Sequence, residues 1–261
     1  MAHLHLVVDG GGGTLARRAA AFRTAPTVWV VEGRALTEAG PAPFRIHSPL
    51  PPEVLAYTPM LEAAGCDVTV EHGRLIGEVL GLEVARVQSE AGVIRMEVGV
   101  GRFDREAHAV IDDDDGVGGG ALAAVVDLVR EHRRPGAPRH PLNQLVPERL
   151  LRRLIVDEPG LVGGEHLRPV PALSPLPDLR SSGPVPAVGV DPDGRAVVVV
   201  CSVGVDVDLV PAAADMRLAD GRDARLVLAV PGRDAVASTR ELAAALTDPA
   251  EVVAVDLPSR S

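Results

Sequence analysis

A proline-rich stretch at residues 169–186 does most to limit how this chain can fold. It holds six prolines and the run Ser181-Ser182-Gly183, and it has no hydrophobic period. Proline removes a backbone donor and fixes φ, so neither a helix nor a central strand continues easily through such a stretch. We therefore predict an N-terminal domain at residues 1–168, a linker at 169–186 and a C-terminal module at 187–261.

The C-terminal module has the clearest strand patterns in the sequence. Residues 187–190 and 195–203 are rich in valine and flank the turn Asp191-Pro192-Asp193-Gly194, which predicts a hairpin. The elements that follow are a helix near residues 210–218, a strand at 225–230, a helix at 235–246 and a strand at 251–255. The predicted order of this module is ββαβαβ.

The N-terminal domain is predicted to be larger and to mix helices with a β meander. Its first elements are a strand at residues 4–8, a glycine turn at 10–13, a helix at 14–22 capped by Thr14 and a strand at 27–31. A helix at 53–64, a meander at 67–100 and helices at 104–111, 121–132 and 147–156 follow. The whole chain is therefore expected to be a mixed α/β protein.

The core must be built almost without aromatic side chains. Apolar residues make up 46% of the chain but aromatic residues only 2%. Valine, leucine, isoleucine and alanine must then fill the interior, and valine favours strands. Cys66 and Cys201 fit no redox or zinc spacing and are expected to be small buried residues. Cys201 follows a run of valines and is predicted to lie in a central, buried strand.

The chain contains no lysine, so all 26 of its basic residues are arginine. This excludes a P-loop, a Schiff-base enzyme, a Ser-Lys hydrolase and a protein kinase, because each of these sites needs a lysine. The formal net charge of −10 opposes nonspecific binding to duplex DNA unless the arginines gather on one face.

The apolar runs are far shorter than the roughly 18 to 20 residues that cross a bilayer. The first residues also lack the basic region and the apolar length of a secretory signal. We therefore expect a soluble, cytoplasmic protein without a membrane partner.

A local concentration of arginine interrupts the acidic sequence at residues 130–153. Arginine forks bind phosphates in bidentate fashion, so this island is the predicted place for any contact with nucleic acid. The residues chosen for that contact are Arg133, Arg134, Arg149 and Arg152. The alternative is that these arginines pair with acids on helix faces, and the island has no aromatic residue on which a base could stack.

Two further patterns have ordinary explanations beside the functional ones. Residues 10–13 are all glycine between a strand and a helix, and Glu32 follows at the place of a ribose-binding acid, but Leu15 departs from the dinucleotide motif. A flexible turn is expected there. Val98-Gly99-Val100 and Val203-Gly204-Val205 both end a hairpin before a predicted helix, which hints at an internal repeat or at the common need for a cap.

The predicted hairpin and helix at residues 188–218 resemble the core of the restriction-endonuclease-like PD-(D/E)xK superfamily. In that family an acid on the first part of the hairpin and an acid and a lysine on its second strand together hold a divalent metal and activate water. Asp191 or Asp193 matches the first acid, but Cys201 and Val203 stand where the second acid and the lysine belong. The resemblance therefore implies a nuclease-like module with its catalytic motif absent. The earlier hairpin keeps Glu83 and Glu97 but has Gly99 at the place of the lysine.

Two functions then compete. The first is a noncatalytic binding or scaffold protein with a protein partner and no cofactor. The alternative is a hydrolase or nuclease that binds Mg²⁺ through carboxylates, because carboxylates alone can hold this ion and activate water. The acids assigned to that site are Glu83, Glu97, Asp104 and Asp191. Whether the protein is an enzyme is left open by the sequence.

Overall fold

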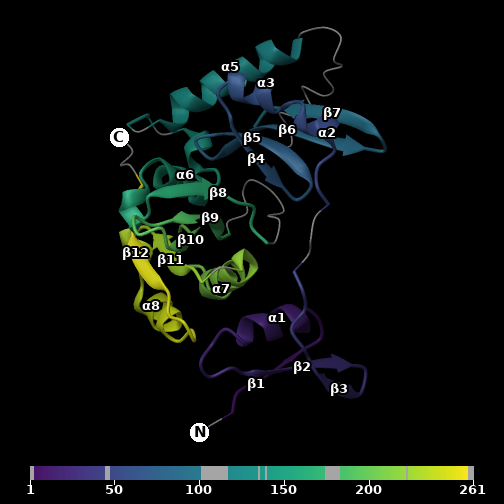
Figure 1. Ribbon diagram of the computed structural model, residues 1–261, viewed down its shortest axis with the longest axis vertical. Coiled ribbons are helices and arrows are strands. Elements are labelled where there is room, and N and C mark those ends of the chain that lie inside the picture. The colour runs from purple at the N-terminus through teal and green to yellow at the C-terminus, as the bar shows by residue number, and fades with distance from the viewer. Residues whose placement is uncertain are drawn as a thin grey trace.

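The computed structural model describes residues 3–44, 48–100, 117–134, 136–138, 140–173, 183–221 and 223–257. The predicted helix at 104–111, and with it Asp104, lies outside these residues. The described chain is a mixed α/β protein, as predicted, and the structure divides its strands into three separate sheets (Figure 1). Within the described residues, no helix combines the length and the apolar character needed to span a membrane.

The N-terminal unit is a parallel βαβ arrangement followed by one antiparallel strand. Its elements are β1 (His5–Val8), α1 (Gly12–Ala19), β2 (Thr27–Glu32) and β3 (Ala35–Glu38). β1 pairs with β2 in parallel, and β2 pairs with β3 in antiparallel fashion. α1 covers one face of this sheet, where only Ala16, Ala19 and Val28 form the buried cluster.

The predicted start of α1 at Thr14 is wrong, because the helix begins at Gly12 after a left-handed Gly11 with φ 67°. A Cβ atom on Gly12 would lie 2.3 Å from Cγ2 of Val30 on β2. The first helical turn therefore rests directly on the strand, which a larger residue at this position would prevent. This contact between distant residues sets the start of the helix, and the capping pattern of the nearby sequence does not indicate it.

The second sheet is the predicted meander, with strand order β4-β5-β6-β7. Its strands and covering helices are α2 (Pro52–Leu55), α3 (Thr58–Ala63), β4 (Asp67–Glu71), β5 (Arg74–Val79), β6 (Leu82–Glu90), β7 (Val93–Val98) and α5 (Val117–Arg133). The single helix predicted at 53–64 is wrong. Pro59 has no N–H to donate to the preceding turn, so the chain forms two short helices instead.

The third sheet has the order β12-β11-β10-β9-β8 and contains the predicted ββαβαβ module. The elements are η1 (Pro141–Gln144), α6 (Pro147–Asp157), η2 (Pro159–Val162), β8 (His166–Pro169), β9 (Val185–Val190), β10 (Ala196–Cys201), α7 (Leu209–Asp220), β11 (Arg225–Val230), η3 (Gly232–Asp234), α8 (Ala237–Ala244) and β12 (Glu251–Ala254). β8 comes from before the proline-rich stretch and pairs with β9. The domain boundary at 169–186 stays a prediction.

Helices cover both faces of this third sheet. Val198 and Val200 of β10 pack with α7 and α8, whereas Val197, Val199 and Cys201 pack with α6. Cys201 is fully buried on the central strand, which confirms its predicted place. Burial raises the pKa of its thiol to about 12.

The first and the last βαβ units of the chain resemble each other. β11, α8 and β12 repeat the order of β1, α1 and β2, and both strand pairs are parallel. The two units also meet through a reciprocal backbone pair: Arg23 N donates to Ala245 O at 3.1 Å, and Thr247 N donates to Ala21 O at 2.9 Å. The bridge between Phe22 and Leu246 marks equivalent positions, five residues before β2 and before β12.

The strand registers extend this equivalence. Val7 is paired with Trp29 in the first unit, and Ala229 is paired with Val253 in the last. Val7 therefore corresponds to Ala229, and Trp29 corresponds to Val253. This repeat differs from the one suggested by residues 98–100 and 203–205, whose first helix lies outside the described residues.

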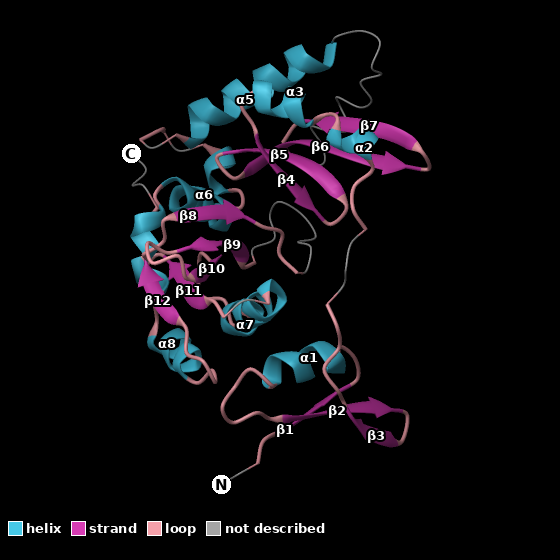
Figure 2. Cartoon of the chain, in the orientation of Figure 1, coloured by secondary structure: helices cyan, strands magenta, loops and turns pink. Residues whose placement is uncertain are grey.

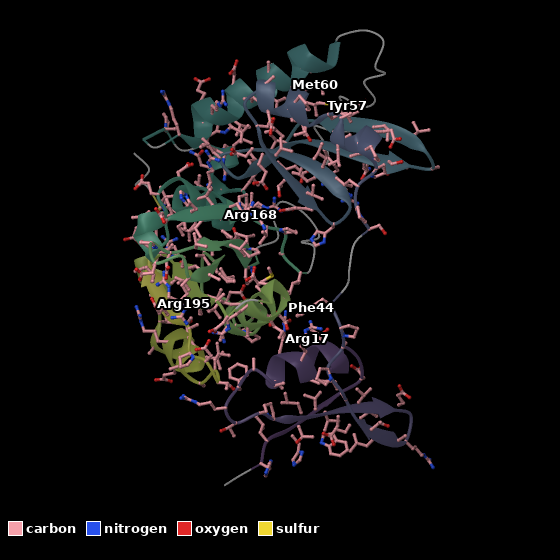
Figure 3. All side chains as sticks on the ribbon, viewed as in Figure 1. Arg17, Phe44, Tyr57, Met60, Arg168 and Arg195 are labelled. Carbon is pink, nitrogen blue, oxygen red and sulfur yellow. The ribbon has the colours of Figure 1, made fainter. Side chains whose placement is uncertain are left out.

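α1 lies between the small sheet and α7, so the face of the sheet opposite α1 points away from the rest of the described chain (Figures 1 and 2). Buried Asp215 of α7 accepts hydrogen bonds from Arg17 Nε at 2.8 Å and Arg18 Nε at 2.9 Å. Cζ of Arg17 also lies 4.2 Å from the centre of the Phe44 ring, and Figure 3 shows the two side chains beside α1. These contacts attach the N-terminal unit to the third sheet.

Candidate functional site

Among the described acids predicted to bind Mg²⁺, Asp191 does not lie in the sheet that carries Glu83 and Glu97. Glu83 is on β6 and Glu97 on β7 of the meander, whereas Asp191 is in the turn between β9 and β10. Oδ1 of Asp191 accepts from the backbone N of Asp193 at 3.1 Å and of Arg195 at 2.9 Å, so this carboxylate closes the hairpin turn. Asp104 lies outside the described residues.

The two meander acids lie beside an arginine. Oε1 of buried Glu83 is 2.8 Å from Nη2 of Arg86, and Glu97 is directly opposite Arg86 in the strand register. Among the described residues, no group of three or more His, Cys, Asp or Glu side chains is arranged to hold a metal ion. The structure therefore leaves the Mg²⁺ hypothesis without the convergent acid cluster on which it depends.

A different set of charges meets between α6 and the meander. Nη2 of Arg149 lies 2.7 Å from Oε2 of Glu71, and its Nη1 also binds Glu78. Nη2 of Arg152 lies 2.9 Å from Oε2 of Glu78, and the side chain of Arg152 is only 2% exposed. These four side chains are the buried ion-pair network that joins α6 to β4 and β5.

The network fixes the charge state of its members. Burial raises the pKa of Glu78, but the positive charges and hydrogen bonds of Arg152 and Arg149 outweigh burial and hold the pKa below its ordinary value. Burial lowers the pKa of Arg149, and Glu78 and Glu71 more than reverse this effect. Glu78 is thus a charged acid compensated by two guanidinium groups, and such a carboxylate is a poor general base at neutral pH.

The backbone of α6 rests on the turn between β5 and β6. A Cβ atom on Gly81, where φ is 72°, would lie 2.4 Å from the carbonyl oxygen of Arg149. Nε of Arg133 donates to the carbonyl of Leu80 in the same turn at 3.2 Å, and its Nη1 donates to the carbonyl of Leu145 at 2.8 Å. Arginines and a glycine thus hold α6 and the loop before it against the meander.

The arginines predicted to bind nucleic acid therefore do not form a common exposed surface. Arg133 and Arg152 are buried, Arg149 is almost so, and all three bind protein acceptors; Arg134 alone of the four is exposed. Sequence reasoning missed the acids that they bind. Glu78 stands inside the buried run of β5, and an acid in such an apolar strand was the available signal.

The positions that resemble a nuclease motif are apolar. Cys201 and Val203, which stand where the family has an acid and a lysine, belong to the hydrophobic cluster on the α6 side of the third sheet. Gly10 and Gly11 of the turn before α1 are exposed, whereas Gly12 is buried, and the backbone N of Ala42 donates to the carbonyl of Gly13 at 2.9 Å. Cys201 and Val203 thus present no charged group to a substrate.

The uncovered face of the small sheet is the clearest candidate surface for binding. We call it the outer face, and its residues are His5, Val7, Trp29, Val31, Leu36 and Glu38. Val7 is 58% exposed and Leu36 is 54% exposed, while Trp29 is half-buried and donates from Nε1 to Nδ1 of His5 at 3.1 Å. This face carries the single tryptophan of the chain.

The repeated unit shows what such a face looks like when it is covered. Ala229 and Val255, which correspond to Val7 and Val31, are 0% and 5% exposed. They pack in one cluster with Leu151 and Ile155 of α6. The outer face is thus the counterpart of a buried surface.

Comparison of the chain with protein-family models, with curated proteins and with solved structures gave no match.

Proposed function

We propose that the chain is a noncatalytic binding or scaffold protein that holds a partner protein on the outer face. The observation that carries this proposal is the contrast between exposed Val7 and Val31 and their buried counterparts in the last βαβ unit. An apolar patch that a related unit covers with a helix marks a place for another polypeptide. On this proposal the C-terminal module is a degenerate nuclease-like support.

The charge arrangement supports a binding role over the hydrolase alternative. The buried acids of the meander bind arginines instead of facing a common cavity. Cys201 and Val203 occupy the place of the resembling family's acid and lysine within an apolar cluster. A buried ion-pair network of this kind holds α6 in place, and a scaffold needs such rigidity.

The size of the outer face indicates the kind of partner segment. With strands about 4.8 Å apart and about 3.3 Å per residue, three strands of four residues cover roughly 200 Å². This is well below the roughly 800 Å² per partner of a standard interface. The face therefore suits a single helix or strand of the partner, bound weakly by its apolar residues.

The test compares capture of partner proteins by two variants with equal charge. Leu36→Asp places a carboxylate on the outer face, and Val207→Asp places one at a site that is 83% exposed and lies outside that face. Proteins retained from an extract of the source cells by immobilised wild type should be lost with Leu36→Asp and kept with Val207→Asp. Equal retention by both variants would contradict binding through the outer face.

A second arm addresses the enzymatic alternative. Purified protein is incubated with nucleic acids and with generic ester and phosphoester substrates in the presence of Mg²⁺ or Mn²⁺. We expect the wild type and the Glu83→Gln variant to show the same background turnover. Metal-dependent turnover by the wild type that this substitution abolishes would replace the binding proposal with the hydrolase.

A further inference from the structure

The open edge of β1 is the second unmatched feature of the N-terminal unit. In the described chain β1 pairs only with β2. Its counterpart β11 pairs with β12 on one side and with β10 on the other, where Ala229 is opposite Cys201. At the edge of β1 that corresponds to the β10 side of β11, the backbone groups have no strand partner among the described residues.

This edge lacks the usual protection against pairing with another strand. Residues 3–8 contain no acidic residue, arginine or proline, and the register with β2 is regular. The opposite edge, β3, is flanked by Glu32 and Arg34 and ends at Glu38. Charges, prolines and bulges are the devices that keep edge strands apart. β3 ends in Glu38 and follows Arg34, whereas β1 contains no charged residue and is followed by Asp9.

One apolar side chain at this edge, Leu4, is also left uncovered by the described residues. Leu4 accepts a backbone hydrogen bond from Thr27 N, so it extends the line of β1 beside β2. Alternation along a strand places Leu4 on the same face as Leu6 and Val8, which pack on α1. Leu4 is nevertheless 61% exposed. The described chain supplies nothing beyond the edge to cover it.

We infer that β1 pairs in antiparallel fashion with β1 of a second copy of this chain, which joins two N-terminal sheets into one six-stranded sheet. A second copy fits because each copy has the same free edge, and a two-fold axis brings identical strands together in a closed dimer. The small cluster of Ala16, Ala19 and Val28 gains apolar neighbours from the second copy. No charged pair is opposed across this contact.

The geometry limits the register, and centring the contact on Leu6 pairs the largest number of residues 4–8. Opposite residues of paired strands must lie on the same face, so odd-numbered residues face odd-numbered ones. With Leu6 on the two-fold axis, Leu4 lies opposite Val8 of the second copy, and His5 lies opposite Val7 of the second copy. Because Leu4 O is bonded toward β2, alternation directs the backbone groups of His5 and Val7 to the free edge. These two residues then exchange both hydrogen bonds.

This dimer would also enlarge the outer face. A two-fold axis perpendicular to the sheet keeps equivalent faces on one side. The two outer faces, each with its Trp29, then form one surface of about 400 Å², twice the area estimated for one copy. The inference goes beyond the proposed function and does not require it, because edge pairing would occur whether or not a partner binds.

The experiment measures the oligomeric state of the full-length protein by sedimentation equilibrium from about 1 to 200 µM, the range in which short interfaces associate. The wild type should show a monomer–dimer equilibrium. Val7→Pro removes a free-edge N–H without removing a bond to β2, and Leu4→Lys places an ammonium group opposite the apolar Val8 of the second copy. Both variants should weaken the dimer at least tenfold.

Val7→Thr is the matched control, because it keeps the N–H and the branched side chain and should dimerise like the wild type. If Val7→Pro fails to fold, as judged by its circular dichroism, Leu4→Lys decides the question. A wild type that remains monomeric, or a dimer that Leu4→Lys leaves intact, overturns the inference. Leu36→Asp separates the two proposals, because it should abolish partner capture while leaving the dimer unchanged.

Discussion

The first and the last βαβ units of this protein follow one plan but differ in their surroundings. In the last unit, β10 occupies one strand edge and α6 covers the face opposite α8. In the first unit, the described chain supplies neither a strand at the edge of β1 nor a helix on the outer face. The same arrangement is thus core in one place and surface in the other.

This contrast shows that the order and alternation of a βαβ unit do not determine which of its faces are buried. Alternation in the strands prepares two apolar faces in both units: Val28 and Trp29 point to opposite faces, as Val252 and Val253 do. Burial depends on what the rest of the chain brings. In the last unit the rest of the chain supplies α6, which Arg149 and Arg152 attach to the meander.

The largest effect should come from placing a charge on equivalent faces. Ala229→Asp buries a carboxylate under α6 and should cost at least about 4 kcal/mol of unfolding free energy. Its counterpart Val7→Asp should cost less than about 1 kcal/mol, because Val7 is exposed. Urea denaturation followed by circular dichroism measures both. Similar losses would remove the distinction between a covered and an uncovered unit.

A smaller but still large effect is expected at the ion pairs that hold α6. Arg152→Met leaves buried Glu78 with one arginine instead of two and should cost about 3 kcal/mol. Adding Glu78→Gln should produce a loss smaller than the sum of the two single losses, because the second substitution removes the uncompensated charge. Additive losses in the same urea experiment would contradict coupling between these groups.

The attachment of the first unit should be weaker than that of α6. Asp215→Asn removes the charge that Arg17 and Arg18 share, and should cost about 2 kcal/mol. Hydrogen exchange should rise in α1 while β11 stays protected. Asp248→Asn is the matched control: its acid is exposed and binds Arg217, so it should cost less than about 0.5 kcal/mol. Equal acceleration in α1 and β11 would indicate a single cooperative unit.

The smallest effect is expected from pH. The pKa of Glu78 is lower in the folded protein than its ordinary value of 4.5, so its contribution to stability is complete above about pH 4.5. This contribution is lost as the pH falls through the folded pKa. Unfolding free energies measured at pH 6, 4.5 and 3.5 should decline less steeply for Glu78→Gln than for the wild type. Parallel declines would mean that Glu78 is not held charged by its arginines.

The sequence predicted β9 to β12 of the third sheet well because their signals are local, but it did not predict β8. The valine-rich runs around Asp191 and Gly194 gave the β9–β10 hairpin, and the strand predicted at residues 225–230 is β11 without a shift. Each of these strands is buried on both faces and reads as an apolar run. A predicted helix boundary was wrong where a contact between distant residues sets it, as at Gly12, which packs against Val30.

The candidate sites were harder to predict because their partners are remote. Arg149 and Glu71 are 78 residues apart, and Arg152 and Glu78 are 74 apart, so the arginine island appeared to be uncompensated. The outer face was missed for a related reason. His5, Val7 and Trp29 form ordinary strand alternation, and only the third dimension leaves them without a cover.

The single tryptophan gives the protein an internal optical probe of one unit. Trp29 lies on β2 and donates to His5 of β1, so its emission reports on the N-terminal sheet. Far-ultraviolet circular dichroism instead averages over all helices and strands. A fluorescence transition that precedes the dichroism transition would thus time the opening of this unit directly, without any label being attached.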